Sequence, residues 1–355
     1  MGTAKNLGFG LVPFQLVKAA AARLKPGPTG KAALALLSLL LPAALTGAPA
    51  APAPADSATP QPYALVVAGL GGEPDYEKQF KELGERVVSA LRKSGLPPER
   101  IVWLPPDRSR REELARAFEA AAARVRPDEP LLVFLIGHGS FDGEYKMNLP
   151  GPDATAADFR QWLDRVPARK QVVLNSTSAS GGAVAAWSRA GRAILAATKS
   201  GEERNATVFM RFFADALSDP GADQDKNGVV SALEAFRYAA QGVAKFYESA
   251  GRLATEHPQL EDTGDGAGVR DPSPQNGKGL LAATGPLVRW SAQTTRADTP
   301  AARELRARKQ SLENDLETLR YRRASLSEQE YSTQLEKLLL ELARTQQRLE
   351  QMEKP

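Results

Sequence analysis

The stretch Leu131-Leu-Val-Phe-Leu-Ile-Gly-His-Gly139 decides the fold of this chain. Its first six residues are apolar without interruption, which is typical of a β-strand covered by helices on both faces. The stretch Val172-Val-Leu-Asn-Ser-Thr-Ser-Ala-Ser-Gly-Gly182 repeats the arrangement, because an apolar strand again runs into a turn of small and polar residues. Open α/β sheets build their sites at the carboxyl ends of such strands. The two stretches therefore predict neighbouring strands that bring His138 and a serine-rich turn to one edge of a sheet.

Strands alternate with amphipathic helices along most of the chain. This alternation predicts a mostly parallel sheet flanked by helices, in a domain that covers residues 63–290. Between residues 255 and 299, Gly, Pro, Asp and Ser predominate and predict long loops. The expected strands are 63–68, 101–104, 131–136, 171–174 and 192–197, with a late strand around 287–290, and the expected helices are 75–94, 108–126, 155–163, 205–218 and 231–253.

The composition is that of a soluble globular protein, with 25% charged and 42% hydrophobic residues among 355. The net charge of +4 is misleading, because residues 1–50 hold five Lys and Arg residues and no acid. Without this segment the net charge falls to −1, so no nucleic-acid partner is expected. The chain has no Cys, which excludes disulfides, thiol catalysis and thiolate metal sites.

The first 50 residues are typical of an export signal. Lys31 precedes an apolar run over residues 32–41, and Ala48-Pro-Ala50 matches the small-residue pattern of a cleavage site. The run is shorter than the ~20 residues that span a bilayer, so no stable membrane span is expected after cleavage. The segment before Lys31 is either a long basic extension or a sign that translation starts further on. Residues 51–62, rich in Ala and Pro, are expected to form a linker, and the protein is expected in the periplasm or outside the cell.

The two strand-end turns hold the groups that acyl-transfer chemistry needs. A nucleophile requires a base within hydrogen-bond reach, and an oxyanion requires backbone donors nearby. His138 is the candidate base and Ser178 the candidate nucleophile. Gly139 is the candidate donor, because no side chain obstructs its N–H.

These residues resemble the caspase/legumain clan of peptidases, in particular its bacterial legumain-like members, over residues 63–285. The resemblance rests on the strand that ends in Gly137-His138-Gly139 and on the strand followed by Ser178-Ala-Ser-Gly181, where the family has Cys, two residues and Gly. The stretch Leu149-Pro-Gly-Pro-Asp153 also resembles the loop that follows the catalytic His in such members. The resemblance implies that His138 is the general base, that Gly139 is the oxyanion-side glycine, and that Ser178 stands in place of the catalytic Cys.

The serine in the place of cysteine decides which mechanism is expected. A thiol is partly ionised near neutral pH, whereas a serine hydroxyl must lose its proton to a base that a third group orients. No orienting carboxylate is evident, although Asp142, Asp153 or Asp158 could approach His138 in space. We therefore expect a catalytically impaired peptidase homologue that binds a peptide or protein partner in the cell envelope.

Other interpretations stay open at this point. A serine-type hydrolase would use the same serine and histidine. The neighbouring Ser176, Thr177 and Ser180 allow a shift of the nucleophile by one position. The plainest interpretation of His138 is a hydrogen-bonded histidine in a glycine turn. The second histidine, His257, lacks any comparable context and is expected to be an ordinary loop residue.

A stretch of twelve residues, 223–234, matches the calcium-binding loop of an EF-hand. Acidic and amide side chains alternate at its start, a glycine stands at the sharp turn, and a glutamate closes the loop. We expect a structural Ca²⁺ site here, and the alternative is a turn whose acids cap the following helix. The expected ligands are Asp223, Asp225, Asn227, Val229 (through its carbonyl), Ser231 and Glu234.

Residues 301–355 are expected to form a C-terminal helical hairpin or coiled coil. Leucines recur at heptad-like spacing in two segments, and Ser327 with Glu330 forms a capping box between them. The hairpin could pack on itself, form a coiled-coil oligomer or pair with a partner helix. The protein would then be an envelope assembly protein. The two seams are Leu305, Leu312, Leu316, Leu319 and Leu326, and Leu335, Leu338, Leu342, Leu349 and Met352.

Overall fold

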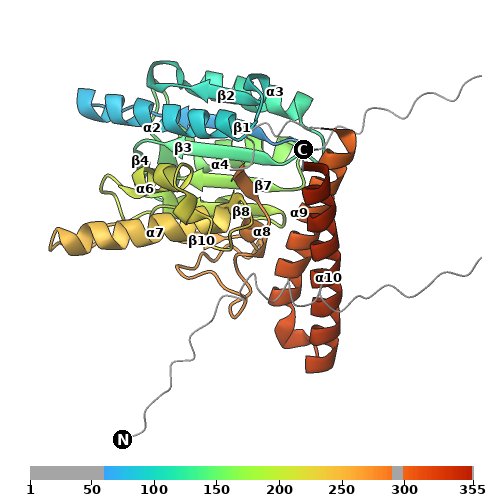
Figure 1. The fold of residues 1–355 in the computed structure, drawn as a ribbon. Coiled ribbons are helices and arrows are strands. Elements are labelled where there is room, and N and C mark those ends of the chain that lie inside the picture. Colours follow the sequence, from blue (N-terminus) through green and yellow to red (C-terminus); the bar gives the residue numbers. More distant parts are fainter. Residues whose placement is uncertain (1–59, 290–298, 354–355) are drawn as a thin grey trace, which may run out of the picture.

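A six-stranded sheet lies at the centre of the computed structural model, which describes residues 60–289 and 299–353 (Figure 1). Its strands span Tyr63–Ala68 (β1), Ile101–Leu104 (β2), Leu131–Ile136 (β3), Gln171–Asn175 (β7), Arg192–Ala196 (β8) and Gln259–Glu261 (β10). They are ordered β10-β8-β7-β3-β1-β2, and all are parallel except β10, which runs antiparallel to β8 at the edge. The expected fold class, a mostly parallel sheet flanked by helices, is confirmed.

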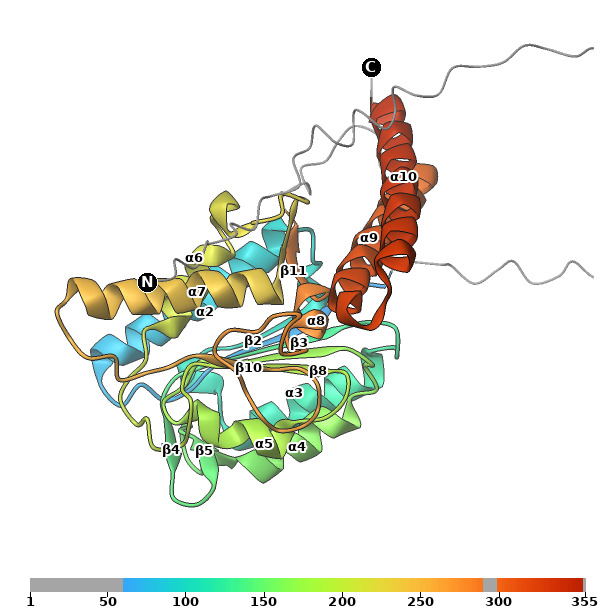
Figure 2. The same cartoon turned by 90° about the horizontal axis from the view of Figure 1, so that it is seen from below.

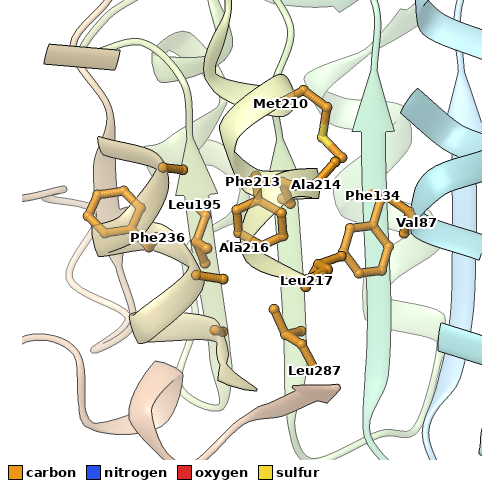
Figure 3. Packing of buried hydrophobic residues seen from close by; sticks show 14 of the residues in the cluster. Val87, Phe134, Leu195, Met210, Phe213, Ala214, Ala216, Leu217, Phe236 and Leu287 are labelled. Atoms are coloured by element: carbon orange, nitrogen blue, oxygen red, sulfur yellow. The ribbon is translucent and has the colours of Figure 1, made fainter. Parts of the chain in front are cut away.

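Three long helices cover one face of the sheet (Figure 2). They are α2 (Pro74–Lys93), α6 (Phe209–Ala216) and α7 (Ala232–Ser249). Their apolar stripes pack on alternate residues of the strands, and Phe134 of β3 meets Phe213 of α6 at a ring-centroid distance of 6.4 Å (Figure 3). Burial of this face removes large apolar side chains from water and thereby fixes the helices on the sheet.

The opposite face is covered by α3 (Arg111–Arg124), α4 (Ala156–Arg165) and the single turn α5 (Val184–Trp187). Aromatic side chains dominate the packing here. Trp187 is fully buried and donates its indole N–H to the Ala156 carbonyl over 3.0 Å. Short 3₁₀ helices at 98–100, 106–108, 180–183, 220–222 and 323–325 complete the connections.

Two small sheets were not predicted from the sequence. One joins β4 (Gly139–Phe141), β5 (Tyr145–Met147) and β6 (Ala154–Thr155). The other pairs β9 (Val229–Ser231) with β11 (Pro286–Arg289), so the expected late strand joins β9 and not the central sheet. These strands have two to four residues each, too few to establish a period of two in the sequence.

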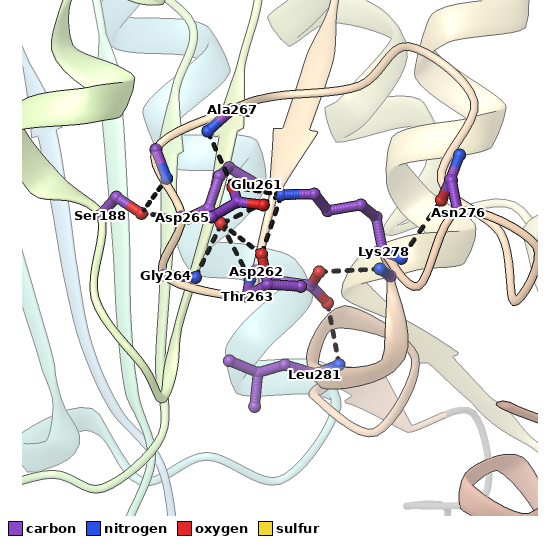
Figure 4. A network of polar contacts seen from close by, with 12 residues as sticks. Ser188, Glu261, Asp262, Thr263, Gly264, Asp265, Ala267, Asn276, Lys278 and Leu281 are labelled. Atoms are coloured by element: carbon purple, nitrogen blue, oxygen red, sulfur yellow. Dashed lines mark hydrogen bonds and ion pairs between the residues drawn. The ribbon is translucent and has the colours of Figure 1, made fainter. Parts of the chain in front are cut away.

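Buried charge orders the loop that follows β10 (Figure 4). Glu261 is fully buried, and its carboxylate accepts a hydrogen bond from Ser188 Oγ over 2.6 Å while Lys278 Nζ lies 3.5 Å away. The next residue, Asp262, accepts backbone N–H groups at the start of α8 (Leu280–Ala283). A buried charge needs such partners, so this network pins the loop against the sheet.

The C-terminal helices α9 (Pro300–Tyr321) and α10 (Glu328–Glu353) form the expected hairpin. Leu312 and Leu319 of α9 and Leu349 of α10 are buried. The hairpin stands beside the amino ends of β1 and β3, and Tyr321 fixes it by donating to the Lys278 carbonyl over 3.0 Å (Figure 1). It therefore lies at the opposite edge of the sheet from the turns that follow the strands.

Several expectations concern residues that lie outside the described ones. They are the signal peptide at 1–50, most of the linker at 51–62 and Trp290 at the end of the expected late strand. Within 60–289 and 299–353, no helix is long and apolar enough to cross a membrane.

Candidate functional site

The candidate site lies at the carboxyl edge of the sheet, where β1, β3, β7 and β8 end side by side. The turn after β3 and the turn after β7 touch there. A side chain at position 139 would place its Cβ 2.5 Å from the Ser178 carbonyl oxygen and 2.8 Å from Thr177 Oγ1, so only glycine fits. The structure thus brings Gly139 and the Ser178 turn together at one edge.

His138 sits against aromatic rings of α2. Its ring centroid lies 4.7 Å from that of Tyr76 and 5.0 Å from that of Phe80, with the rings nearly perpendicular. Burial lowers the pKa of the His138 imidazole, and the Gly71 backbone and the Glu73 carboxylate offset this only in part. An imidazole with a lowered pKa is neutral at pH 7 and is a weaker base than an ordinary histidine.

The three carboxylates considered as orienters of His138 are engaged elsewhere. Asp142 pairs with Lys146 over 2.8 Å. Asp153 accepts the Leu149 N–H over 3.0 Å. Asp158 belongs to the capping box that starts α4 and to an ion pair with Arg111. Among the described residues, none of these three carboxylates forms a hydrogen bond or an ion pair with the imidazole.

Ser178 is almost inaccessible, with 2% of its surface exposed. The residues just before it form a buried polar cluster. Tyr145 Oη lies 2.7 Å from Thr177 Oγ1 and 3.2 Å from Asn175 Oδ1, and burial raises the pKa of the Tyr145 phenol. The Asn175 side-chain N–H₂ is buried without a hydrogen-bond partner among the described residues. This cluster holds the turn from inside the protein.

A narrow cavity of about 10 Å³ lies beside His138, between α2 and the start of α6. Ser176, and not Ser178, lines it, together with Thr207. Ser176 Oγ donates to the Leu135 carbonyl over 2.8 Å, and Thr207 Oγ1 donates to the Ser176 carbonyl over 2.5 Å. A space of this size holds at most one water molecule, so it does not admit a peptide side chain.

The second histidine, His257, lies at the same edge of the sheet. His257 is a loop residue, as expected, but it is half-buried and its Nδ1 forms a short contact with Glu203 Oε1. The carboxylate is also bound by the backbone N–H groups of His257 (3.1 Å) and Lys199 (2.9 Å). The sequence signal was the Glu256-His257-Pro258 stretch, but its partner lies 54 residues away.

Glu256 adds a buried carboxylate to this part of the rim. It accepts the N–H of Val208 over 2.7 Å and that of Phe209 over 3.2 Å, at the start of α6. Burial raises its pKa to about 7, and the nearby Glu203 charge contributes to the rise. The hydrogen bonds from the helix start and from Tyr247 oppose this effect without cancelling it.

The stretch 223–234 folds as a closed loop before α7. The carboxylate oxygens of Asp223, Asp225 and Glu234 lie within 4.8 Å of one another. Asp223 accepts the N–H of Gly228 over 2.9 Å, and Gly228 has a φ of +85°, which favours glycine. Loss of hydration and the nearby Glu234 and Asp223 charges raise the pKa of Asp225 to about 7. The alternative capping role is also present, because Ser231 and Glu234 form a capping box on α7.

Comparison with known proteins identifies no family for this chain. No family model matches the sequence, and no curated protein matches it. Among solved structures, the chain is similar to protein GSU0716 from Geobacter sulfurreducens, with a TM-score of 0.40 and 11% identity over 61% of this chain and 96% of that one. It is also similar to the Drosophila initiator caspase Dronc, with a TM-score of 0.35 and 11% identity over 59% of this chain and 82% of that one. Neither similarity assigns an activity to this chain.

Proposed function

We propose that this chain is an exported caspase/legumain-like peptidase homologue that is catalytically impaired and binds a peptide or protein partner at the carboxyl edge of its sheet. The observation that carries the proposal is the state of the nucleophile position. Ser178 is 2% exposed, and the adjoining cavity of about 10 Å³ is lined by Ser176. A serine that is shielded from solvent, beside a cavity too small for an acyl group, is poorly placed to attack a substrate.

A covalent serine probe tests the loss of catalysis. We expect a fluorophosphonate to leave Ser178 unlabelled in the wild-type protein, while a known serine hydrolase in the same tube is labelled. The alternative function, a serine-type hydrolase, has support in the contact between Gly139 and the Ser178 turn. Labelling of Ser178 that disappears in the His138→Gln variant would establish that hydrolase and contradict our proposal.

Partner binding is tested with a displayed library of random peptides. Gln79 is exposed on α2 next to His138, so Gln79→Trp should obstruct a peptide that lies across this surface without removing a hydrogen bond of the rim. The matched control is Gln241→Trp, which adds the same bulk to the groove between α6 and α7, a groove that His138 does not line. We expect peptides to be enriched by the wild type and by Gln241→Trp but not by Gln79→Trp. Equal enrichment by all three proteins would contradict binding at this edge.

Export of the protein is a further part of the proposal. Its support is the sequence pattern around Lys31 and Ala48-Pro-Ala50. We expect the amino terminus of the protein isolated from cells to start just after Ala50, and an intact amino terminus in the cytoplasmic fraction would contradict export.

We further propose that the loop 223–234 binds Ca²⁺ as a structural ion. Three carboxylates within 4.8 Å repel one another, and a divalent cation with oxygen ligands relieves that repulsion. Asp223, Asp225 and Glu234 would hold the ion, with Asn227, Val229 and Ser231. We expect Ca²⁺ to raise the melting temperature of the wild type and of Glu248→Gln, an exposed control on the same helix, but not of Glu234→Gln. An equal rise in all three would contradict a site in this loop.

The alternative of an assembly protein has one observation in its favour. Leu335, Leu338 and Leu342 of α10 are only half-buried by the pairing with α9. A partner helix would complete their burial. Light scattering of the full chain tests this function: an oligomer that becomes a monomer when these leucines are replaced by Lys supports it, and a wild-type monomer excludes self-assembly.

A further inference from the structure

Glu203 contacts both His257 and the turn that carries Ser178. Its side-chain carboxylate is bound by the His257 ring and by two backbone N–H groups. Its backbone carbonyl accepts the N–H of Ala179, the residue directly after Ser178, over 2.8 Å. Glu203 thus connects His257 on the rim with the turn that carries Ser178.

Ala179 needs this support because its backbone is strained. It is fully buried and has a φ of +57°, in the left-handed region that residues other than glycine rarely adopt. Such a conformation is unfavourable and persists only where surrounding contacts impose it. Besides the bond to Glu203, the Ala179 carbonyl accepts the Gly182 N–H over 2.9 Å within the same turn. The Glu203 carbonyl is therefore the hydrogen-bond partner that ties the Ala179 N–H to another loop.

The loop 198–208, which contains Glu203, is held from both sides. Toward the Ser178 turn, Thr198 Oγ1 accepts the Gly181 N–H over 2.8 Å, and Thr207 Oγ1 donates to the Ser176 carbonyl. Toward β10, the contacts come from His257 and Glu256. A change at residues 256–257 therefore reaches the Ser178 turn through this loop.

We propose that Glu203 and His257 are positioning residues of the candidate site, which hold the turn after Ser178 in its left-handed conformation. The inference goes beyond the proposed function, because it requires neither a bound peptide nor a reaction. It gives His257, and not His138, control over the shape of this edge.

Lys199 also faces the pair. Its Nζ lies 3.6 Å from Glu203 Oε1, so Lys199 and His257 both hold the Glu203 carboxylate. The variants that test the proposal therefore change His257 and Glu203 separately.

Amide hydrogen exchange at one fixed pH tests the proposal on the full chain. His257→Ala removes the bond and should accelerate exchange of the Ala179 amide about 10-fold or more, a change expected from losing one charge-assisted hydrogen bond. His257→Asn keeps a donor in the place of Nδ1, so it should restore most of the protection.

The matched pair Glu203→Gln and Glu202→Gln completes the test. Glu202 is the neighbouring residue, its side chain is 71% exposed, and its ion pair is with Arg204. Glu203→Gln weakens the contact with His257 and should accelerate exchange at Ala179, whereas Glu202→Gln should leave it unchanged. Acceleration confined to residues 199–204, or unchanged exchange at Ala179 in both His257→Ala and Glu203→Gln, would overturn the proposal. If His257→Ala does not fold, Glu203→Gln and its control decide alone.

Discussion

The two histidines of the chain lie on the same edge of the sheet in opposite surroundings. His138 follows β3 and is packed edge-on against Tyr76 and Phe80, so burial lowers its pKa. His257 precedes β10 and is bonded to the Glu203 carboxylate. A carboxylate that holds Nδ1 is the arrangement that orients an imidazole for proton transfer in hydrolases.

A residue's position in a fold and the chemical environment of its side chain are separate properties. His138 occupies the place that the family resemblance assigns to a base, yet its ring packs against two aromatic rings and is hydrogen-bonded to the Gly71 backbone and not to a carboxylate. His257 has the oriented imidazole, yet it lies outside the pair of turns that the resemblance selects. Three measurements test whether the two histidines differ in this way.

The first prediction concerns the apolar side of the contrast. Phe80 is 7% exposed and belongs to the main core as well as to the His138 contact. Phe80→Ala should lower the free energy of unfolding by about 3–5 kcal/mol, because a buried aromatic ring is replaced by a cavity. Tyr76→Ala removes the other, half-buried ring and should cost clearly less in the same denaturant titration. Equal losses would show that His138 is not embedded in the core through Phe80.

The second prediction concerns the charged side. The folded state raises the pKa of Glu256 to about 7 from an ordinary value of 4.5, so the native protein binds a proton more tightly than the unfolded chain. This contribution to stability is complete at low pH and is lost as the pH rises from 4.5 through 7. Between pH 5 and 8 it should remove roughly 2–3 kcal/mol from the free energy of unfolding.

Glu256→Gln should flatten that dependence. The amide keeps an acceptor for the N–H groups at the start of α6 but cannot ionise. The measurement is the difference in unfolding free energy between wild type and variant at each pH, since other titrating groups then cancel. An unchanged difference from pH 5 to pH 8 would mean that Glu256 titrates like an exposed carboxyl.

The third prediction is the smallest effect and addresses His138 itself. Its imidazole should titrate below the ordinary histidine value, because burial between rings disfavours the charged form. NMR of the imidazole groups measures this directly, with assignment by His138→Gln. Tyr76→Ala, which opens one side of the ring to water, should raise the pKa of His138. A titration of His138 at or above the ordinary value would remove the distinction drawn between the two histidines.

Much of the central sheet could be predicted, because long apolar runs specify buried parallel strands. The bounds of β1 and β3 agree with the expected ranges, since both runs are uninterrupted. β10 was not predicted, because Gln259–Glu261 is short and ends in a buried glutamate that depends on Lys278. A short segment with a glutamate predicts a loop as long as the distant partner of that glutamate is unknown.

Part of the candidate site could also be predicted from the sequence. That Gly139 and the Ser178 turn meet follows from two neighbouring parallel strands ending at one edge. The lining of the cavity by Ser176 could not be predicted, because it depends on which way each side chain of a tight turn points. The calcium-type loop was recognised from spacing alone, and its carboxylates do converge, although their binding of Ca²⁺ remains a prediction.

Residues close together in the chain encode the parallel sheet, the glycine and serine turns at its edge and the helical hairpin. These elements can therefore be predicted from the sequence alone. The burial of Ser178 and the contact of His257 with the Glu203 carboxylate become visible only in the folded structure. The physical reason is that solvent exposure and charge pairing depend on loops 198–208 and 255–258, which the antiparallel pairing of β10 with β8 brings together.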